Sequence, residues 1–463
     1  MAFVNTPLIL RLCGRAQPEY INHLKVRAHG SSHQIVYMGP QGQQELIEHY
    51  QHCDIFVFPS HSEGLGKALL EAMSCGCPVV CSDIPIRQKD MHTDNNRPIA
   101  FFIPALNGGG AQKVVVNLVN ALPELTDHPL HVVLARREGE FLDELRPEVQ
   151  VIDLGTNSAS RSVWALARYM RTYKPQVLMS SMNYANIVCM LSGLLARRPC
   201  RIVLREATVV LPHSGSSPVR FRKNRLIYLM TLFYPFADGI IANSQNTLNS
   251  MEQAGIRVRN KAAVIGNPIT IPPPTPEPIS WDWLPEPCPP FICSAGRLAE
   301  PKGFDILLSA FARLKDTRLH LVILGEGELR VSLTRQAEDL GIEDRVHMPG
   351  FVQNPMAVVR QSEVFVLSSR WEGFGNVLVE ALATGVPVVS TDCPGAPRDI
   401  LENGAHGHLV SHDDPDALAA GISRALENPA GTPERRKARA EDFSAEKIAR
   451  KYLEEALLPD KQS

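Results

Sequence analysis

The stretch from residue 364 to residue 390 places a strand, a glycine-containing loop, a helix and a second strand in direct succession. An apolar run, Val364 to Leu367, leads into the loop, and the helix-like segment ends before the apolar pair Val388-Val389. Two strands that are joined by one helix run parallel, and parallel sheets carry helices on both faces. The stretch therefore predicts an α/β domain with a doubly wound parallel sheet.

The loop before this helix predicts a site for a ligand that carries both phosphates and hydroxyls, such as a nucleotide sugar. If the helix begins near Phe374, Glu372 lies in the loop and Glu380 about two turns into the helix. Backbone N–H groups at a helix N-terminus bind anions. Here they would belong to Gly375, Asn376 and Val377. The alternative is a turn that only packs the helix closely against the sheet.

Residues 1–90 repeat part of the C-terminal half of the chain. With Gly14 aligned to Gly325 and two extra residues further on, residues 54–83 fall on residues 363–392 with 14 identities in 30 positions. This agreement indicates a duplicated supersecondary unit. The copy lacks a counterpart of the 296–303 loop, so we interpret it as half of a nucleotide-binding domain.

The duplicated segment is predicted to contain only part of the candidate site. Glu63 and Glu71 fall on Glu372 and Glu380, and the polar residues 88–97 that follow indicate a linker. Two interpretations stay open for residues 1–90. They are a fusion remnant without chemistry of its own, or a segment that packs on the main body or forms an oligomer contact.

Composition indicates a cytoplasmic protein of about three domains. The 463 residues are 44% hydrophobic and 21% charged, and the formal net charge of −2 gives no reason to expect nucleic acid as the main partner. No apolar run is long enough for a transmembrane helix, and the first residues lack the pattern of a signal peptide. Ten irregularly spaced cysteines indicate reduced thiols. Cys75, Cys77 and Cys81 have no histidine at zinc-site spacing, so we expect no metal there.

Residues 97–270 predict the first complete α/β domain. A buried strand, Ile99 to Pro104, leads into the Gly108-Gly109-Gly110 loop, and Lys113 to Leu122 has helical periodicity. Glycines let a backbone approach a ligand closely, or simply make a tight turn. Further strands are expected at 130–134, 149–154, 177–180, 202–204 and 239–242.

The segment 218–235 carries four interleaved cations followed by an apolar, aromatic run. Such a segment can hold a protein peripherally on the anionic cytoplasmic face of a membrane. A core helix with a basic, solvated end is the alternative.

A linker with ten prolines between Asn267 and Pro290, assigned to residues 268–290, leads to a second domain over residues 291–430. We expect the linker to be extended and to stay outside the core. In the second domain, Gly296, Arg297 and Lys302 follow a strand. An arginine and a lysine five residues apart in a strand-end loop can converge on one diphosphate, although a solvated basic loop is the alternative.

Several motifs in order give the chain a resemblance to a known family. They are the Gly108-Gly109-Gly110 loop, Asn267-Pro268, Gly296-Arg297 with Lys302-Gly303, the Arg345 to Phe351 segment, and Glu372 to Glu380 followed by Gly385-Val386-Pro387. Over residues 97–458 the chain resembles a retaining glycosyltransferase of family 4. The resemblance implies the GT-B architecture, with two Rossmann-like domains facing a cleft. It also implies a last helix, over 445–457, that crosses back onto the first domain.

The resemblance implies a role for each candidate residue. Arg297 and Lys302 would neutralise the donor diphosphate and Glu372 would contact the donor sugar, which makes these three the expected catalytic set. Glu380 would bind the ribose hydroxyls, and the backbone at Phe351 would border the base. The other expected donor contacts are Gly108, Gly109, Gly110, Gly296, Gly373, Phe374, Gly375, Asn376 and Val377. Because cationic side chains take the place of a metal, no divalent ion or other cofactor is expected.

One departure from the family concerns the acceptor side. Many relatives carry a histidine near the reacting carbon, but the corresponding strand ends here contain no histidine. Asn183, Arg205 and Glu206 are weaker candidates for acceptor contacts, and no catalytic base is assigned.

The expected function is transfer of a sugar from a nucleotide diphosphate donor, of the UDP-hexose or UDP-N-acetylhexosamine type. The acceptor would be a glycan or a lipid-linked glycan in surface polysaccharide biosynthesis. Two alternatives stay open: a catalytically impaired or scaffolding fusion protein, and a nucleotide-sugar epimerase of the same fold.

Overall fold

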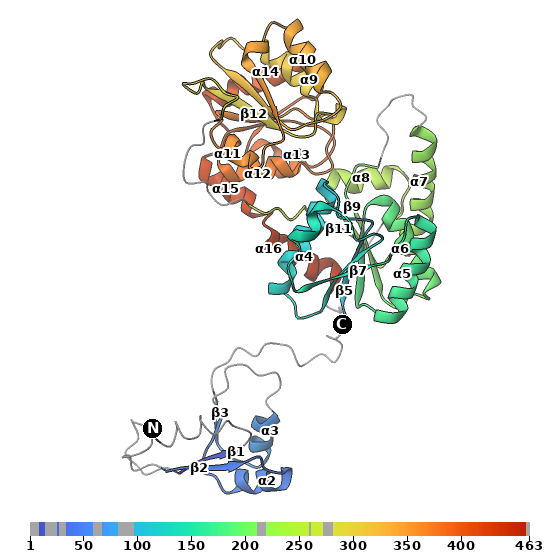
Figure 1. Ribbon diagram of the computed structural model, residues 1–463, viewed down its shortest axis with the longest axis vertical. Coiled ribbons are helices and arrows are strands. Elements are labelled where there is room, and N and C mark those ends of the chain that lie inside the picture. The colour runs from blue at the N-terminus through green and yellow to red at the C-terminus, as the bar shows by residue number, and fades with distance from the viewer. Residues whose placement is uncertain are drawn as a thin grey trace. The chain divides into compact units, whose positions relative to one another are not determined.

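The computed structural model describes residues 9–13, 26, 34–58, 67–81, 97–210, 219–258, 261–271 and 281–459. The chain divides into two compact units, Met1–Asn95 and Asn96–Ser463 (Figure 1). The larger unit contains two parallel sheets, each with helices on both faces.

The first described sheet of the larger unit has seven parallel strands in the order β11-β10-β9-β8-β5-β6-β7. The central strands β5, β6 and β8 are buried along their whole length, as expected for a sheet covered on both faces. The strand bounds are β5 Ile99–Ile103, β6 Leu130–Leu134, β7 Val149–Asp153, β8 Val177–Ser181, β9 Arg201–Glu206, β10 Gly239–Ala242 and β11 Ala262–Val264.

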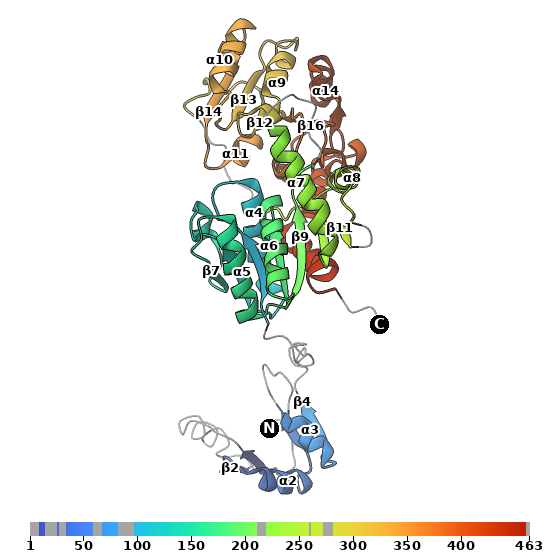
Figure 2. The same cartoon turned by 90° about the vertical axis from the view of Figure 1, so that its right-hand side faces the viewer.

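Helices cover both faces of this sheet (Figure 2). They are α4 Gly110–Ala121, α5 Ala159–Tyr173, α6 Asn183–Leu195, α7 Val219–Phe233 and α8 Gln245–Gln253. One core joins the sheet to α5, α6 and α7 through residues such as Leu166, Met190 and Met230. The other core joins it to α4 and to the C-terminal segment through Val115 and Tyr452. The segment comprises α16 Ala445–Lys451 and a π-helical turn, Tyr452–Leu457, so the end of the chain returns to the first domain.

The second described sheet has six parallel strands in the order β14-β13-β12-β15-β16-β17. Their bounds are β12 Phe291–Ala295, β13 His320–Leu324, β14 Val346–Gly350, β15 Val364–Leu367, β16 Val388–Thr391 and β17 His408–Val410. One face packs on α9 Phe304–Phe311, α10 Arg330–Asp339 and α14 Pro415–Glu427. The other packs on α11 Pro355–Val359, α12 Asn376–Thr384 and α15 Pro433–Glu441. The predicted α/β class with two Rossmann-like domains is confirmed.

Two hydrophobic residues in the described part of the proline-rich linker are buried, which the sequence does not suggest. Ile269 and Leu284 both belong to the core of the second domain, and Ile269 also forms a β-bridge with Ser444. The expectation that the linker stays outside the core is therefore wrong at these two positions. An extended, proline-rich backbone fixes which side chains face inward, so single apolar residues can still be buried.

The smaller unit contains two separate pairs of parallel strands. They are β1 Ile9–Cys13 with β2 Gln34–Gly39, and β3 Phe56–Phe58 with β4 Val79–Cys81. In the alignment of the two copies these strands match β13, β14, β15 and β16. In the complete sheet β12 lies between β13 and β15 and so connects the two strand pairs. The described part of the unit has no strand in that central place, so its strands form two pairs and no continuous sheet.

The smaller unit also exposes a sheet face that the complete domain covers. Ile55, Val57 and Val80 are 54%, 50% and 55% exposed. Their counterparts Val364, Val366 and Val389 are fully buried in the core that α9 and α14 cover. The copy ends before any counterpart of α14. Its own helices, α2 Gln43–Gln51 and α3 Lys67–Ser74, enclose a small core around Tyr50, Ala72 and Cys77.

Candidate active site

The candidate site lies at the carboxyl ends of the central strands of the second sheet. Strands β12 and β15 are direct neighbours, so the loops that follow them lie side by side. The first loop carries Arg297 and Lys302, and the second carries Glu372. Open α/β sheets bind ligands at this edge, where the strand order reverses.

Lys302 and Glu372 contact each other although 70 residues separate them in the sequence. Lys302 Nζ lies 2.5 Å from Glu372 Oε1, and Ser369 Oγ donates to the same oxygen over 2.6 Å. The Glu372 side chain is 8% exposed and the Lys302 side chain 24%. The structure thus brings together a cation and a carboxylate that sequence reasoning placed on two separate motifs.

Arg297 is exposed at the end of β12. Its side chain forms no ion pair or hydrogen bond with any other residue that the structure describes. Gly296 lies beneath the aliphatic part of Lys302, since an added Cβ there would lie 3.4 Å from Lys302 Cδ. The guanidinium is therefore available to a ligand, whereas Lys302 is already held by Glu372.

The helix after the second loop begins slightly later than expected. Its N-cap is Gly375, with a φ of 98° that favours glycine, and α12 starts at Asn376. The side chain of Phe374 is buried against Phe443, with ring centroids 5.7 Å apart, so only its backbone faces the site. Asn376 Oδ1 accepts a hydrogen bond from Asn267 Nδ2 over 2.7 Å, and Val377 is half-buried.

Residues of the first domain contact the second loop directly. Asn243 Nδ2 donates to Gly373 O over 3.0 Å, and also to Ala207 O over 2.9 Å. A Cβ added at Gly373 would lie 2.6 Å from Ala207 O, so this position has no room for a larger residue. The loop that carries Glu372 is therefore fixed against the end of β9.

Glu380 lies on α12, half-buried and within the electrostatic reach of Lys113 on α4 of the first domain. Burial raises the pKa of its carboxyl above the usual value, and the charge of Lys113 opposes that shift. The two helices thus bring charged groups of opposite sign toward each other from the two domains.

The Gly108-Gly109-Gly110 loop ends at the N-terminus of α4. Gly109 is the N-cap and Gly110 the first helical residue. A Cβ at Gly108 would lie 1.9 Å from Glu140 Oε1, so the glycine allows a close approach to that carboxylate. Phe351, expected near the base, follows β14 and is 86% exposed.

Two of the three acceptor-side candidates are fully buried. Arg205 donates to Tyr452 Oη over 2.9 Å, to Ser181 Oγ over 3.0 Å and to Asn267 Oδ1 over 2.5 Å. These partners belong to the C-terminal segment, to β8 and to the residue just before the linker. In this structure Arg205 therefore joins three parts of the fold.

Glu206 accepts a hydrogen bond from Tyr234 Oη over 3.0 Å, and burial raises the pKa of its carboxyl to about 7. Asn183, the third candidate, is half-buried at the start of α6. The residue before it, Met182, has a φ of 87°. This backbone conformation is unfavourable for any residue other than glycine. Sequence patterns carry no signal for this strained position. The acceptor roles of all three candidates stay predictions.

Sequence reasoning missed two groups of residues around the site. Asn243 and Ser369 hold the loop that carries Glu372, but isolated polar residues at strand ends are too common to indicate such contacts. Arg370 forms ion pairs with Asp305 and Asp413, which are far from it in the sequence. No three His, Cys, Asp or Glu side chains in the described segments are grouped so as to hold a metal ion. Metal independence stays a prediction.

Comparison with protein families agrees with this architecture. Residues 4–97 and 277–443 match the model described as glycosyl transferases group 1, and residues 108–271 match glycosyltransferase family 4. The first model matches both copies of the repeated unit, which confirms that residues 1–90 duplicate part of the C-terminal domain.

Individual relatives extend the likeness over most of the larger unit. A Campylobacter jejuni enzyme, N-acetylgalactosamine-N,N'-diacetylbacillosaminyl-diphospho-undecaprenol 4-alpha-N-acetylgalactosaminyltransferase, is 30% identical over 77% of this chain and 99% of its own. A lipopolysaccharide core biosynthesis glycosyltransferase of Rhizobium meliloti is 37% identical, over 36% of this chain and 49% of its own.

Solved structures show the same fold at lower identity. An Anabaena protein crystallised with UDP and glucose has a TM-score of 0.62 at 23% identity, covering 78% of this chain and 99% of its own. Sucrose-phosphate synthase of Thermosynechococcus elongatus has a TM-score of 0.65 at 20% identity, covering 77% of this chain and 97% of its own. The chain belongs to the group 1, family 4 glycosyltransferases and has their GT-B fold.

Proposed function

We propose that the protein transfers a hexose or N-acetylhexosamine, with retention of configuration, from a UDP donor to a lipid-linked or polysaccharide acceptor. The observation that carries the proposal is the contact between Lys302 and Glu372 beside the N-terminus of α12. A cation, a carboxylate and free helical N–H groups at one point suit a ligand that carries both phosphates and hydroxyls.

The names of relatives support this donor and acceptor class. The Campylobacter jejuni relative is named for transfer of N-acetylgalactosamine to a diphospho-undecaprenol-linked sugar, and the Rhizobium meliloti relative for lipopolysaccharide core biosynthesis. The Anabaena structure contains UDP. We therefore infer the nucleotide, sugar and acceptor of this chain from its similarity to these proteins.

In the proposed reaction the cations act on the departing nucleotide. Negative charge grows on the diphosphate as the bond to the sugar breaks, and Arg297 and Lys302 stabilise it most at the transition state. Glu372 contacts the donor sugar and Glu380 the ribose hydroxyls. The departing phosphate oxygen can accept the proton of the attacking hydroxyl, so the mechanism needs no separate protein base.

A panel of nucleotide sugars tests the proposal. The full chain is incubated with UDP-, GDP- and ADP-sugars and a polyprenyl diphosphate-linked glycan, and products are followed by mass spectrometry and NMR. We expect transfer from a UDP-sugar with an α-linked product. Free, isomerised donor would identify an epimerase, and no binding or turnover of any donor would favour the scaffolding alternative.

We also propose that α7 contacts an anionic membrane surface. Arg225, Tyr228 and Leu232 are exposed on one side of this helix, whereas Met230 is buried on the other. A basic residue beside exposed aromatic and aliphatic residues suits the interface of an anionic bilayer. No helix in the described part of the chain is long and apolar enough to span a membrane.

Vesicle binding tests this surface. The variant Y228S/L232S should sediment less with phosphatidylglycerol vesicles than the unmodified chain. The control is V331S on α10, where Val331 is also exposed and apolar but belongs to the second domain. Equal loss in both variants, or none in either, would contradict the assignment of the contact to α7.

A further inference from the structure

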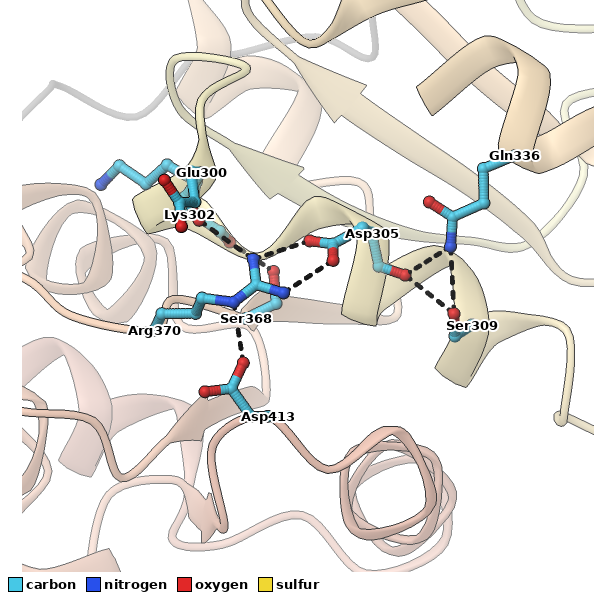
Figure 3. A network of polar contacts seen from close by, with 8 residues as sticks. All are labelled: Glu300, Lys302, Asp305, Ser309, Gln336, Ser368, Arg370 and Asp413. Carbon is cyan, nitrogen blue, oxygen red and sulfur yellow. Dashed lines mark hydrogen bonds and ion pairs between the residues drawn. The ribbon is translucent and has the colours of Figure 1, made fainter. Parts of the chain in front are cut away.

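Arg370 lies at the centre of an ion-pair cluster beside the candidate site (Figure 3). Its two terminal nitrogens donate to the two oxygens of Asp305, over 2.9 Å and 2.7 Å. Its Nε lies 2.8 Å from Asp413 Oδ1. We call Arg370, Asp305 and Asp413 the Arg370 cluster. Only 22% of the Arg370 side chain is exposed, so this is no freely solvated surface pair.

The cluster joins three segments of the second domain. Asp305 is in the first turn of α9, Arg370 is in the loop after β15, and Asp413 precedes α14. Two further hydrogen bonds connect Arg370 to backbone carbonyls just before α9, and we call this connection between the loop after β15 and α9 the joint. Arg370 N donates to Pro301 O over 2.8 Å, and Arg370 Nη1 donates to Glu300 O over 3.1 Å.

Lys302 and Glu372, two of the charged residues of the candidate site, lie on the same two segments. Lys302 is next to Pro301, and its carbonyl oxygen accepts a hydrogen bond from Ser368 Oγ over 2.8 Å. Glu372 is two residues beyond Arg370. The contacts of Arg370 therefore lie on the same two segments that carry Lys302 and Glu372.

We propose that Arg370 is a positioning residue, which through Asp305 and Asp413 sets the placement of Lys302 relative to Glu372 before the donor binds. The inference rests on the proposed function, since it assumes that these two residues contact the donor. Arginine suits the task because its planar, five-donor fork satisfies one carboxylate with two hydrogen bonds and still reaches a second group.

Two further observations agree with this role. Partial burial would raise the pKa of Asp305, but the hydrogen bonds and charge of Arg370 outweigh it and hold that pKa below the usual value. In the duplicated segment, His61 stands at the position of Arg370, so the copy lacks the arginine of the cluster. The full cluster thus occurs only in the copy that also carries Arg297 and Lys302.

The test compares R370A, R370K and D305N with the unmodified full chain. Affinity for UDP is measured by calorimetry, and kcat and KM by hydrolysis of UDP-glucose, with thermal unfolding as a separate readout. We expect R370A to weaken UDP binding or slow hydrolysis by about 10- to 100-fold, because small misplacements of binding groups have effects of this size. The UDP affinity and hydrolysis rate of R370K should lie between those of R370A and the unmodified chain, since lysine keeps the charge but cannot make the two parallel hydrogen bonds of the guanidinium group.

The matched control is R313A. Arg313 pairs with Asp416 over 2.7 Å and so also joins the end of α9 to α14, but it contacts neither loop of the site. R313A should lower the unfolding temperature as R370A does while leaving UDP affinity unchanged. If R370A and R313A affect only the unfolding temperature, Arg370 is structural and the proposal fails.

Failure of the proposed function is separable from failure of this inference. If the unmodified chain binds no UDP, the donor assignment fails, and crystal structures of the unmodified chain and R370A decide the inference. An altered distance between Lys302 Nζ and Glu372 Oε1 in R370A would support the positioning role. An unchanged distance would overturn it.

Discussion

At the scale of single residues, the two candidate diphosphate cations differ in what holds them. Lys302 is paired with Glu372, so its position is set before any ligand arrives. Arg297 is exposed and makes no ion pair in the described part of the chain. A mutation of Arg297 therefore tests ligand contact with little effect on the fold.

We expect Arg297→Ala to lower transfer by about 100-fold or more, as does the loss of one preorganised charge-stabilising donor elsewhere. The free energy of unfolding should change by less than about 0.5 kcal/mol, as for most surface substitutions. Steady-state kinetics and denaturant unfolding measure the two effects. R318A is the control, since Arg318 is exposed and, among the residues that the structure describes, pairs with nearby Asp316. Near-normal activity of Arg297→Ala would show that the diphosphate binds elsewhere.

Glu206 should make the stability of the protein depend on pH. Its folded-state pKa of about 7 lies above the ordinary value of 4.5, so the folded state binds more protons than the unfolded state between these values. Stability should therefore fall as pH rises through this range, by up to about 3 kcal/mol.

The variant E206Q keeps the shape and removes the titration. Denaturant unfolding is measured at a pH near the ordinary pKa of a glutamate and at a pH above the raised pKa of Glu206. The free energy of unfolding should differ less between these two pH values for E206Q than for the unmodified chain. The same pH dependence in both proteins would mean that other groups cause it.

At the scale of elements, the joint between α9 and the loop after β15 depends on close packing at Gly303. Gly303 is the N-cap of α9 with a φ of 60°, and a Cβ there would lie 2.2 Å from Ser368 O. Gly341 has a similar φ of 64°, but a Cβ there would meet nothing within 4 Å. The two positions separate backbone strain from close packing.

We expect Gly341→Ala to cost about 1 kcal/mol of folding free energy, the strain of a left-handed alanine, and Gly303→Ala clearly more. Gly303→Ala should also reduce donor binding because it displaces the segment that carries Lys302. Denaturant unfolding and UDP calorimetry of both variants measure this. An equal loss of folding free energy at the two positions would mean that the close contact between Gly303 and Ser368 does not contribute to stability.

At the scale of the whole molecule, the smaller unit has half of a domain and an exposed apolar sheet face. We expect a chain that begins at Met91 to keep the full donor affinity and transfer rate, because every candidate site residue of the second copy lies beyond it. Assays of the full chain and of residues 91–463 under the same conditions check this. A lower rate in the shorter chain would instead indicate that residues 1–90 contribute to the fold or to an oligomer.

The isolated segment 1–90 should lack a cooperative thermal transition and bind a hydrophobic dye. Its small core cannot offset the entropy of ordering the chain, and Ile55, Val57 and Val80 are exposed. A sharp unfolding transition would show that the segment folds independently. In that case the interpretation as a fusion remnant would lose its main support.

The sequence by itself determined the local structure. Strands such as Gly239–Ala242 and Val364–Leu367 were predicted residue for residue, because continuous apolar runs between turns leave few alternatives. The strands Ala262–Val264 and His408–Val410 were not predicted, since each is only three residues long at a sheet edge and less buried. The duplication was also readable, because identical residues at a fixed spacing need no structure to be recognised.

The tertiary structure alone decided which side chains meet. Lys302 and Glu372 converge because β12 and β15 are neighbours in the sheet, although the strands between them in sequence lie on the other side of β12. Arg205 was expected to face an acceptor, yet it is buried among Tyr452, Ser181 and Asn267, which come from three distant segments. Strand order and burial are properties of the folded chain. A motif can therefore name candidate residues, but it cannot show which of them are buried in contacts with other parts of the protein.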